Sequence, residues 1–441
     1  MNSADPRCLV PLLAAGLALS AFAAPPAAAA AVSPVPAVST VPAGVPLTLD
    51  QAYADALARS EAVAEKGETY AQLIAQIDEM WSAVQPRLSV NASHQWQDTP
   101  GAGVSFPLPA NQQTVAIAGH QPLFSGLREF LAVRETRAQG RSAELAFERA
   151  KQLLYQDVAA AYLNLLQSHQ DLGVREAQLK LDADRIKELE GFERIGRSRV
   201  SEVLAARSQR AQDEADLETA WAQERVDQET MRFLTGRGDR FEPAELPLPA
   251  EADAASYLAR ARSRPDVESA REDLKASSLF VSIQRRQYWP TISLDGNYYL
   301  LRPDNYYRHV NWDATLTGSI PLYSGGQISA QVREAKARER YNEQALSLAE
   351  RQAALDVRTA HSDLTSDLRI VRALMAAKDL AEANAKAQDH DYRYGLVTNL
   401  DVLSSLATVE STSLRLDQAR AAAILAGIRL EVAAGGPESA R

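Results

Sequence analysis

A stretch from Leu127 to about Glu190 contains no proline and is rich in alanine, leucine and charged residues. If the whole stretch is helical, it spans about 96 Å at about 1.5 Å per residue. No compact domain needs so long a helix, so the chain is expected to form extended helical rods. Five apolar residues in it recur at seven-residue intervals, the spacing at which helices supercoil around neighbours. These residues are Val158, Leu165, Leu172, Leu179 and Ile186.

A second proline-free stretch runs from Ile328 to about His390 and repeats the first at a constant distance along the chain. Four pairs of matching positions are each separated by 199 residues: Phe124 and Tyr323, Gly196 and Gly395, Val203 and Val402, and Gly236 and Gly435. Because this distance is constant, neither copy has an insertion relative to the other between these positions. The sequence is therefore interpreted as a tandem duplication of one large unit, in contrast to a solenoid of short repeats.

Alternation of apolar and polar residues precedes each rod and predicts β-strands. The expected hairpins cover 87–123 and 291–322. In the first, Leu88, Val90 and Trp96 share one face. In the second, Asp295 and Asp313 lie on the polar face, where they are candidates for lining an aqueous lumen.

The segment Pro-Leu-aromatic-Ser-Gly ends both hairpins, at 122–126 and at 321–325, where a strand is expected to pass into a helix. Before the hairpins, Thr48 and Gln51 form a capping-box pattern that predicts a helix up to Val84, and Pro265 opens the corresponding helix of the second copy. The expected domain boundaries follow from these elements. They are a first repeat at 48–236 with long helices at 127–235, a linker at 237–264, a second repeat at 265–435 with long helices at 328–434, and a tail at 436–441.

The amino terminus has the pattern of an export signal. An apolar run follows Arg7, and Ala21-Phe22-Ala23 matches a cleavage site, so a signal peptide is expected at 1–23. Residues 24–47 are mostly proline, alanine and valine and are expected to be an extended tether. Cys8 is the only cysteine and leaves with the signal, so no lipid anchor, disulfide or thiol chemistry is expected.

Charge and motif content argue against several classes of function. The formal net charge is -10 at pH 7 and no basic cluster stands out, so nucleic acid is not an expected partner. The six histidines lack metal-ligand spacing, and no nucleophile elbow, zinc-protease motif or phosphate-binding loop occurs. We expect no catalytic residues, no metal and no cofactor, and therefore no enzyme.

The strands have about the ten residues that cross a bilayer when tilted, and aromatic residues gather at their ends. A soluble β-sandwich is the alternative. Four strands cannot close a barrel, and open edges in lipid leave backbone groups unpaired. Several chains are therefore expected to pool their strands in the outer-membrane lipid, while the rods pack in a ring that continues the tube.

The chain resembles the TolC family of outer-membrane efflux and secretion channels from position 47 to 435. The most specific part is 391–419, which is similar to the family's Tyr-x-x-Gly-Leu-x-Thr-x-x-Asp-Val-Leu stretch, and 191–215 is a degenerate copy. The resemblance implies an α+β membrane protein that is a homotrimer. Each chain contributes four strands to a twelve-stranded β-barrel and long coiled-coil helices to a periplasmic α-barrel. It also implies a periplasmic adaptor protein and an inner-membrane pump as partners.

The resemblance assigns roles to residues near the turns between the long helices. Asp401 corresponds to an acidic residue of the channel constriction, while Ser404 stands where the family often has a second one. Glu202 and Tyr392 correspond to residues that link neighbouring helices in the closed state. The positions that correspond to the adaptor-docking tips are Ile195, Gly196, Gly395, Leu396 and Thr398. The first copy departs from the family at Arg197.

Three functions remain open at this stage. The leading one is a passive exit duct that conducts drugs or other small molecules, and the same duct serves type I protein secretion. The long rods also suit a soluble periplasmic coiled-coil scaffold. A periplasmic hydrolase has only unpaired carboxylates in its favour.

Overall fold

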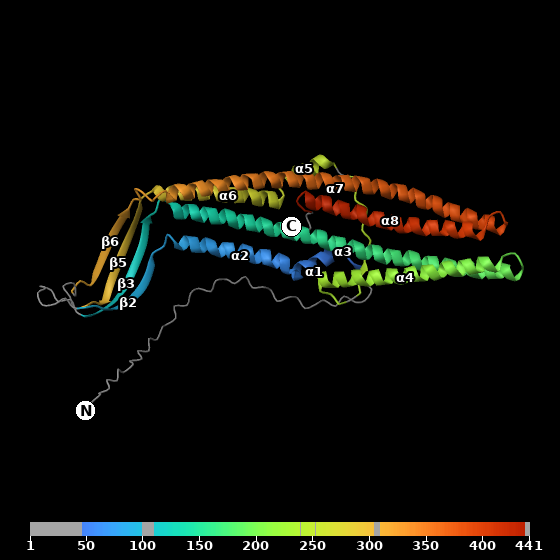
Figure 1. The fold of residues 1–441 in the computed structure, drawn as a ribbon, viewed down its shortest axis with the longest axis horizontal. Helices are drawn as coiled ribbons and strands as arrows, with labels where there is room; N and C mark the ends of the chain where they lie inside the picture. The colour runs from blue at the N-terminus through green and yellow to red at the C-terminus, as the bar shows by residue number, and fades with distance from the viewer. Residues whose placement is uncertain (1–45, 99–109, 239, 252, 304–308, 437–441) are drawn as a thin grey trace, which may run out of the picture. The chain divides into compact units, whose positions relative to one another are not determined.

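A computed structural model of the chain describes residues 46–98, 110–238, 240–251, 253–303 and 309–436. The expected signal peptide, nearly all of the expected tether and most of the expected tail lie outside these residues. The described part is mainly helical and contains one four-stranded sheet at one end of the long helices (Figure 1).

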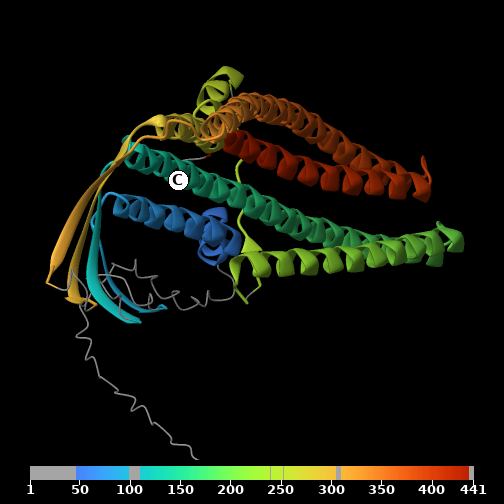
Figure 2. The ribbon, with the colours of Figure 1, turned by 60° about the vertical axis from the view of Figure 1, so that its left-hand side comes forward.

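Two helices of equal length form the rods. Helices α3 (Arg128–Arg194) and α7 (Gln327–Arg393) each have 67 residues, about 100 Å of helix, and their bounds keep the 199-residue offset. Helix α4 (Val200–Thr235) folds back along α3, and α8 (Asn399–Ala433) folds back along α7 (Figures 1 and 2). Of the five heptad residues, Leu179 is partly buried and the others are buried, so the seven-residue spacing marks a packed seam.

The helix expected from Thr48 to Val84 is divided in two, which corrects the prediction. Thr48 caps α1 (Leu49–Arg59) in the expected capping box with Gln51. At Ser60 the backbone is extended, with φ −65° and ψ 107°, and its hydroxyl accepts a hydrogen bond from the Val63 amide. A serine in this geometry starts a new helix, so α2 (Glu61–Ser82) begins there and packs on α3.

The segment 237–264, expected as a linker, contains two small elements. Strand β4 (Glu242–Pro243) pairs in parallel with β1 (Pro46–Leu47), and α5 (Ala254–Ala261) packs on α7. The buried Tyr162 hydroxyl lies 2.7 Å from the Leu47 carbonyl and 2.9 Å from the Ala244 carbonyl. This hydroxyl fastens both short strands to α3.

The second copy begins with α6 (Pro265–Arg285) and the 3-10 turn η1 (Arg286–Tyr288). Helix α6 packs between α3 and α7. At its start, Arg264 is 2% exposed and pairs with Asp266 at 2.6 Å and Asp356 at 2.8 Å. Its guanidinium also donates to the Ala433 carbonyl at 3.3 Å, so one side chain joins α6, α7 and the end of α8.

The sheet joins the two copies. Its order is β2 (Arg87–Trp96), β3 (Asn111–Phe124), β5 (Thr291–Leu301) and β6 (Trp312–Ser319), all antiparallel. Strands β2 and β6 are at its edges. Leu88, Val90 and Leu316 are 78%, 68% and 66% exposed, so a single chain leaves the apolar face of the sheet uncovered.

Among the described residues, no helix combines the length and the hydropathy that a membrane-spanning helix requires.

Candidate gate and docking tips

Two turns lie at the ends of the long helices, opposite the sheet (Figure 1). Residues 195–199 join α3 to α4, and residues 394–398 join α7 to α8. We call these two turns the tips. Every residue expected at the constriction, the helix links or the docking tips lies in a tip or within about two helical turns of one.

The two tips have the same backbone geometry. Gly196 and Gly395 have φ of 74° and 75°, the left-handed region that favours glycine, and a Cβ at either position meets no atom within 4 Å. In each tip an amide reaches back to close the helix: Arg197 N to Phe192 O at 2.8 Å and Leu396 N to Asp391 O at 3.0 Å. The departure of the first copy at Arg197 therefore leaves the turn itself intact.

Apolar side chains stand out from both tips. Ile195 is 66% exposed and Leu396 is 73% exposed. Where such exposed apolar residues gather into one patch, they offer a contact surface to another molecule. Thr398, expected with them at the docking surface, is exposed and is also the N-cap of α8.

Asp401 belongs to this cap. The Thr398 amide and hydroxyl both donate to Asp401 Oδ2, at 2.8 and 2.6 Å. The Thr398 hydroxyl, followed by its amide, holds the pKa of the Asp401 carboxyl below its usual range, so this exposed side chain stays charged in mild acid. Ser404 is also exposed and lies one turn further along α8, so the two form one continuous surface.

A hydrogen bond links Tyr392 at the end of α7 to Glu202 at the start of α4. The Tyr392 hydroxyl donates to Glu202 Oε2 at 3.0 Å, and the Ser198 hydroxyl donates to the same oxygen at 2.7 Å. Burial is the main cause that raises the pKa of Tyr392, so the hydroxyl keeps its proton and remains a donor. The two residues named from the resemblance are thus in direct contact between the two helical hairpins.

Arg185 on α3 is a further member of this link and was missed from the sequence. It is 5% exposed, and its guanidinium makes two hydrogen bonds to Asn399 Oδ1, at 3.1 and 3.0 Å. It also pairs with Glu188 at 2.9 Å and Asp389 at 3.3 Å. The guanidinium carbon lies 4.1 Å from the centroid of the Tyr392 ring, a cation–π contact. Arg185 therefore joins α3 to both α7 and α8.

The strand aspartates lie far from the tips on the polar face of the sheet. Asp295 on β5 is opposite His120 on β3, with 2.6 Å between Oδ1 and Nδ1. Asp313 on β6 is opposite Asn297, whose amide donates to it at 3.0 Å. Asp295 itself is opposite Thr315, so the two aspartates are diagonal neighbours on adjacent strands.

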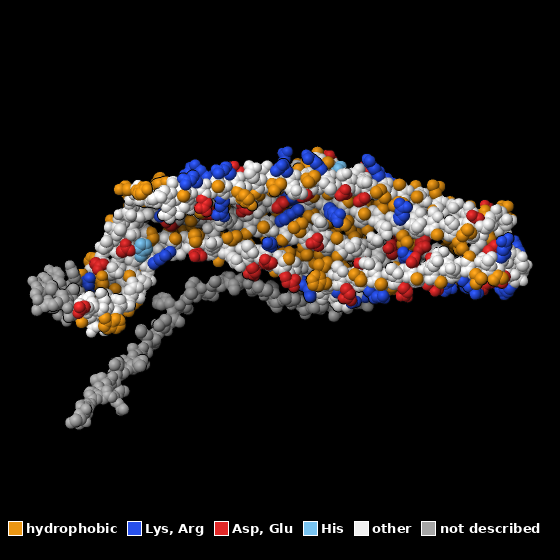
Figure 3. Space-filling view, in the orientation of Figure 1, with side chains coloured by type: hydrophobic (Ala, Val, Ile, Leu, Met, Phe, Trp, Pro, Cys, Tyr) orange, Lys and Arg blue, Asp and Glu red, His pale blue; other side chains and the backbone are white. Residues whose placement is uncertain are grey.

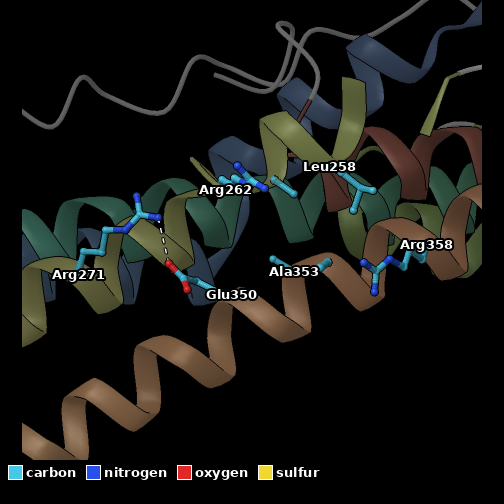
Figure 4. Close-up of a pocket in the computed structure, with 8 residues that line it drawn as sticks. Leu258, Arg262, Arg271, Glu350, Ala353 and Arg358 are labelled. Carbon is cyan, nitrogen blue, oxygen red and sulfur yellow. Dashed lines mark hydrogen bonds and ion pairs between the residues drawn. The ribbon is translucent and has the colours of Figure 1, made fainter. Parts of the chain in front are cut away.

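A pocket of about 480 Å³ lies between α5, α6 and α7 (Figure 4). Three arginines and one carboxylate provide its charged lining, and Arg271 pairs with Glu350 across it at 3.2 Å. Its lining contains no serine, cysteine or histidine, and its one carboxylate, Glu350, is paired with Arg271. Within the described ranges, no group of three or more histidine, cysteine and acidic side chains is arranged to hold a metal.

Basic and acidic side chains alternate along the helices on the face in Figure 3, without a large area of one sign. This face therefore has no patch of concentrated positive charge of the kind that binds phosphate backbones.

Comparison with known proteins gives a consistent result. The family model for outer membrane efflux proteins matches residues 256–436. Outer membrane efflux protein BepC of Brucella suis is 27% identical over 339 residues, which cover 73% of this chain and 72% of BepC. The toluene efflux pump outer membrane protein TtgC of Pseudomonas putida is 24% identical over 366 residues, 76% of this chain and 74% of TtgC.

A likeness to solved structures extends over nearly the whole described chain. The outer membrane protein VceC of Vibrio cholerae matches with a TM-score of 0.78 and 19% identity, over 88% of this chain and 96% of VceC. At this identity the match establishes a shared fold.

Proposed function

Because the chain belongs to the TolC-like family of outer membrane efflux proteins, we propose that it is the exit duct of a tripartite efflux pump. In this role it passively conducts drugs or other small molecules that an inner-membrane transporter and a periplasmic adaptor deliver. The family and fold are those of channels, and the location is the outer membrane with an extension into the periplasm.

The observation that carries the proposal is the incomplete sheet. Its apolar face is uncovered, and both edge strands, β2 and β6, have one side without a partner in the single described chain. Exposed edges of this kind are not stable in lipid, so further copies must pair with them. A homotrimer that pools four strands per chain into a twelve-stranded barrel satisfies both requirements. Asp295 and Asp313 then face its lumen.

The tips supply the other half of the proposal. The exposed Ile195 and Leu396 beside Gly196 and Gly395 form the surface that docks the adaptor. The contacts of Arg185, Tyr392 and Glu202 hold the α7–α8 hairpin against α3–α4 in the closed state. Asp401, with Ser404 one turn away, narrows the periplasmic entrance, where three copies place a ring of carboxylates.

Complementation tests the proposal. In a Gram-negative strain without its own exit ducts, the chain, expressed with its cognate adaptor and pump, is expected to restore resistance to toxic small molecules. It should appear in outer-membrane detergent extracts as a trimer whose migration changes on heating. Recovery in the soluble periplasmic fraction would favour the scaffold alternative. Export of a protein substrate without restored resistance would favour type I secretion.

Replacement of Asp401 by alanine is expected to raise the conductance of the closed channel severalfold, because it removes the carboxylate ring and loosens the start of α8. Planar-bilayer recordings measure this change. In the wild type, the preference for cations is expected to persist from about pH 8 to about pH 5, since the lowered pKa keeps Asp401 charged. Asp391→Ala, at the end of α7, is the control. Unchanged conductance in Asp401→Ala would remove Asp401 from the constriction.

A further inference from the structure

Two aspartates face each other between α3 and α4. Asp182 on α3 is 2% exposed, Asp213 on α4 is 7% exposed, and their carboxyl groups lie within hydrogen-bonding reach of each other. Each Oδ1 accepts a hydrogen bond at 3.0 Å from a glutamine on its own helix, Gln178 and Gln209. Neither Oδ2 has a hydrogen-bond donor among the described residues.

The two carboxyl groups need one shared proton to be stable in contact. Two buried carboxylates in contact repel each other strongly when both are ionised. A proton on one Oδ2 converts the contact into an O–H···O hydrogen bond and removes one buried charge. The carboxyl groups therefore form a pair that favours binding a single proton.

The charges around the pair come from all three helices that meet there. Glu410 on α8, whose side chain is 15% exposed, adds its charge to both aspartates. Arg175 on α3 lies 3.6 Å from Glu410 and 3.6 Å from Asp216 on α4. Its positive charge is thus divided between two carboxylates outside the pair. The cluster has an excess of negative charge, and a proton reduces it.

The pH range follows from the same contacts. Burial, then the hydrogen bond and charge of Asp213, raise the pKa of Asp182 from 3.8 to about 7. Burial and the charge of Asp213 also raise the pKa of Glu410. The folded protein then binds more protons than the unfolded chain between these two pH values. Packing at this cluster is therefore most stable in acid and weakens as the pH rises towards 7.

We propose that Asp182 and Asp213 form a proton-binding site that couples the contact of α8 with the α3–α4 hairpin to the pH of the periplasm. With the proton bound, Glu410 remains beside a singly charged pair and α8 stays packed on α3. When the proton leaves, three carboxylates repel one another and α8 moves outward. The site favours the closed channel in acid and the open channel at higher pH. Only the link to opening rests on the proposed channel function.

Two measurements on the full-length trimer test this inference. Infrared difference spectra are expected to show a protonated-carboxyl band that disappears as the pH rises through about 7. In planar bilayers, closed-channel conductance is expected to rise severalfold over the same range. Asp182→Asn supplies a permanent neutral donor, so it should lack the band and keep a low conductance at every pH. Asp213→Asn should behave in the same way.

Asp184→Asn is the matched control, because Asp184 lies on the same helix and its side chain is 64% exposed. It should keep both wild-type titrations. A wild type without a titrating carboxyl band, or with a band that survives in both asparagine variants, overturns the proton site. A titrating band together with a conductance that does not depend on pH overturns the coupling. If the chain forms no channel at all, the infrared titration still decides the site separately from the proposed function.

Discussion

Replacement of Arg185 by alanine is expected to raise the open probability of the channel about a hundredfold. The change removes the cation that pairs with Glu188 and Asp389 and leaves Asn399 Oδ1 without its donor. Loss of one partner from a buried ion pair costs about 3–5 kcal/mol, and partial exposure of the two carboxylates favours the lower end. Each 1.4 kcal/mol is about tenfold in an equilibrium constant. Single-channel recordings give the open probability.

The expected result depends on Arg185 acting in the closed state. Arg207→Ala is the control, since Arg207 pairs with Glu190 at 2.7 Å near the same tip but is 58% exposed. A surface pair of this kind contributes about 0–1 kcal/mol, so gating should change little. Arg185→Lys keeps the charge but loses the forked hydrogen bonds and should open to an intermediate degree. Equal opening in Arg207→Ala and Arg185→Ala would contradict a specific role for Arg185.

Local sequence features were sufficient to predict the rods and the strands. A long stretch without proline can stay helical, and apolar residues at heptad spacing lie on one face of that helix. Val158 and Leu165 are fully buried, as that spacing requires. The alternation in 87–96 likewise produces β2. The tip glycines were predictable because only glycine adopts a left-handed backbone without cost.

Other features depend on contacts between distant residues and were not predictable. Arg185 and Asn399 are 214 positions apart, and the acidic run around Arg185 resembles an ordinary solvated helix face. The segment 237–264 was expected to be a linker. Strand β4 within it forms through pairing with the distant β1 and through the contact of Tyr162 with Ala244, and neither is visible in the local sequence. At Ser60 a single hydroxyl decides between a continuous helix and a new N-cap, and the surrounding alanines favour the former.

The pattern of Thr398 and Asp401 can be interpreted in two ways from the sequence. Thr398 followed by Asp401 is a capping box. The resemblance assigns the same two residues to the docking tip and to the constriction. The structure shows the cap directly, and a channel role for the same carboxylate is compatible with it because the side chain remains exposed. A residue that satisfies a helix end can also face the entrance, so the sequence alone does not separate the two functions.

Replacement of Gly395 by tryptophan is expected to abolish resistance in the complementation assay while the trimer remains intact. A side chain at this position has open space around it, so the indole projects from the tip beside the exposed Leu396 and occupies the proposed docking surface. The left-handed backbone adds about 1–2 kcal/mol of strain, which a helical hairpin of this length tolerates. Minimal inhibitory concentrations and trimer migration in outer-membrane extracts measure the two effects.

Gly395→Ala distinguishes the effect of side-chain size from that of backbone strain. Alanine has the same strain in the left-handed backbone but adds only one methyl group to the surface. It should retain most of the resistance. Gly196→Trp has the same φ in the first copy, where Arg197 departs from the family motif, and a smaller loss is expected there. If alanine abolishes resistance as completely as tryptophan, the cause is the strained turn. If tryptophan leaves resistance normal, the surface at Gly395 is not where the adaptor docks.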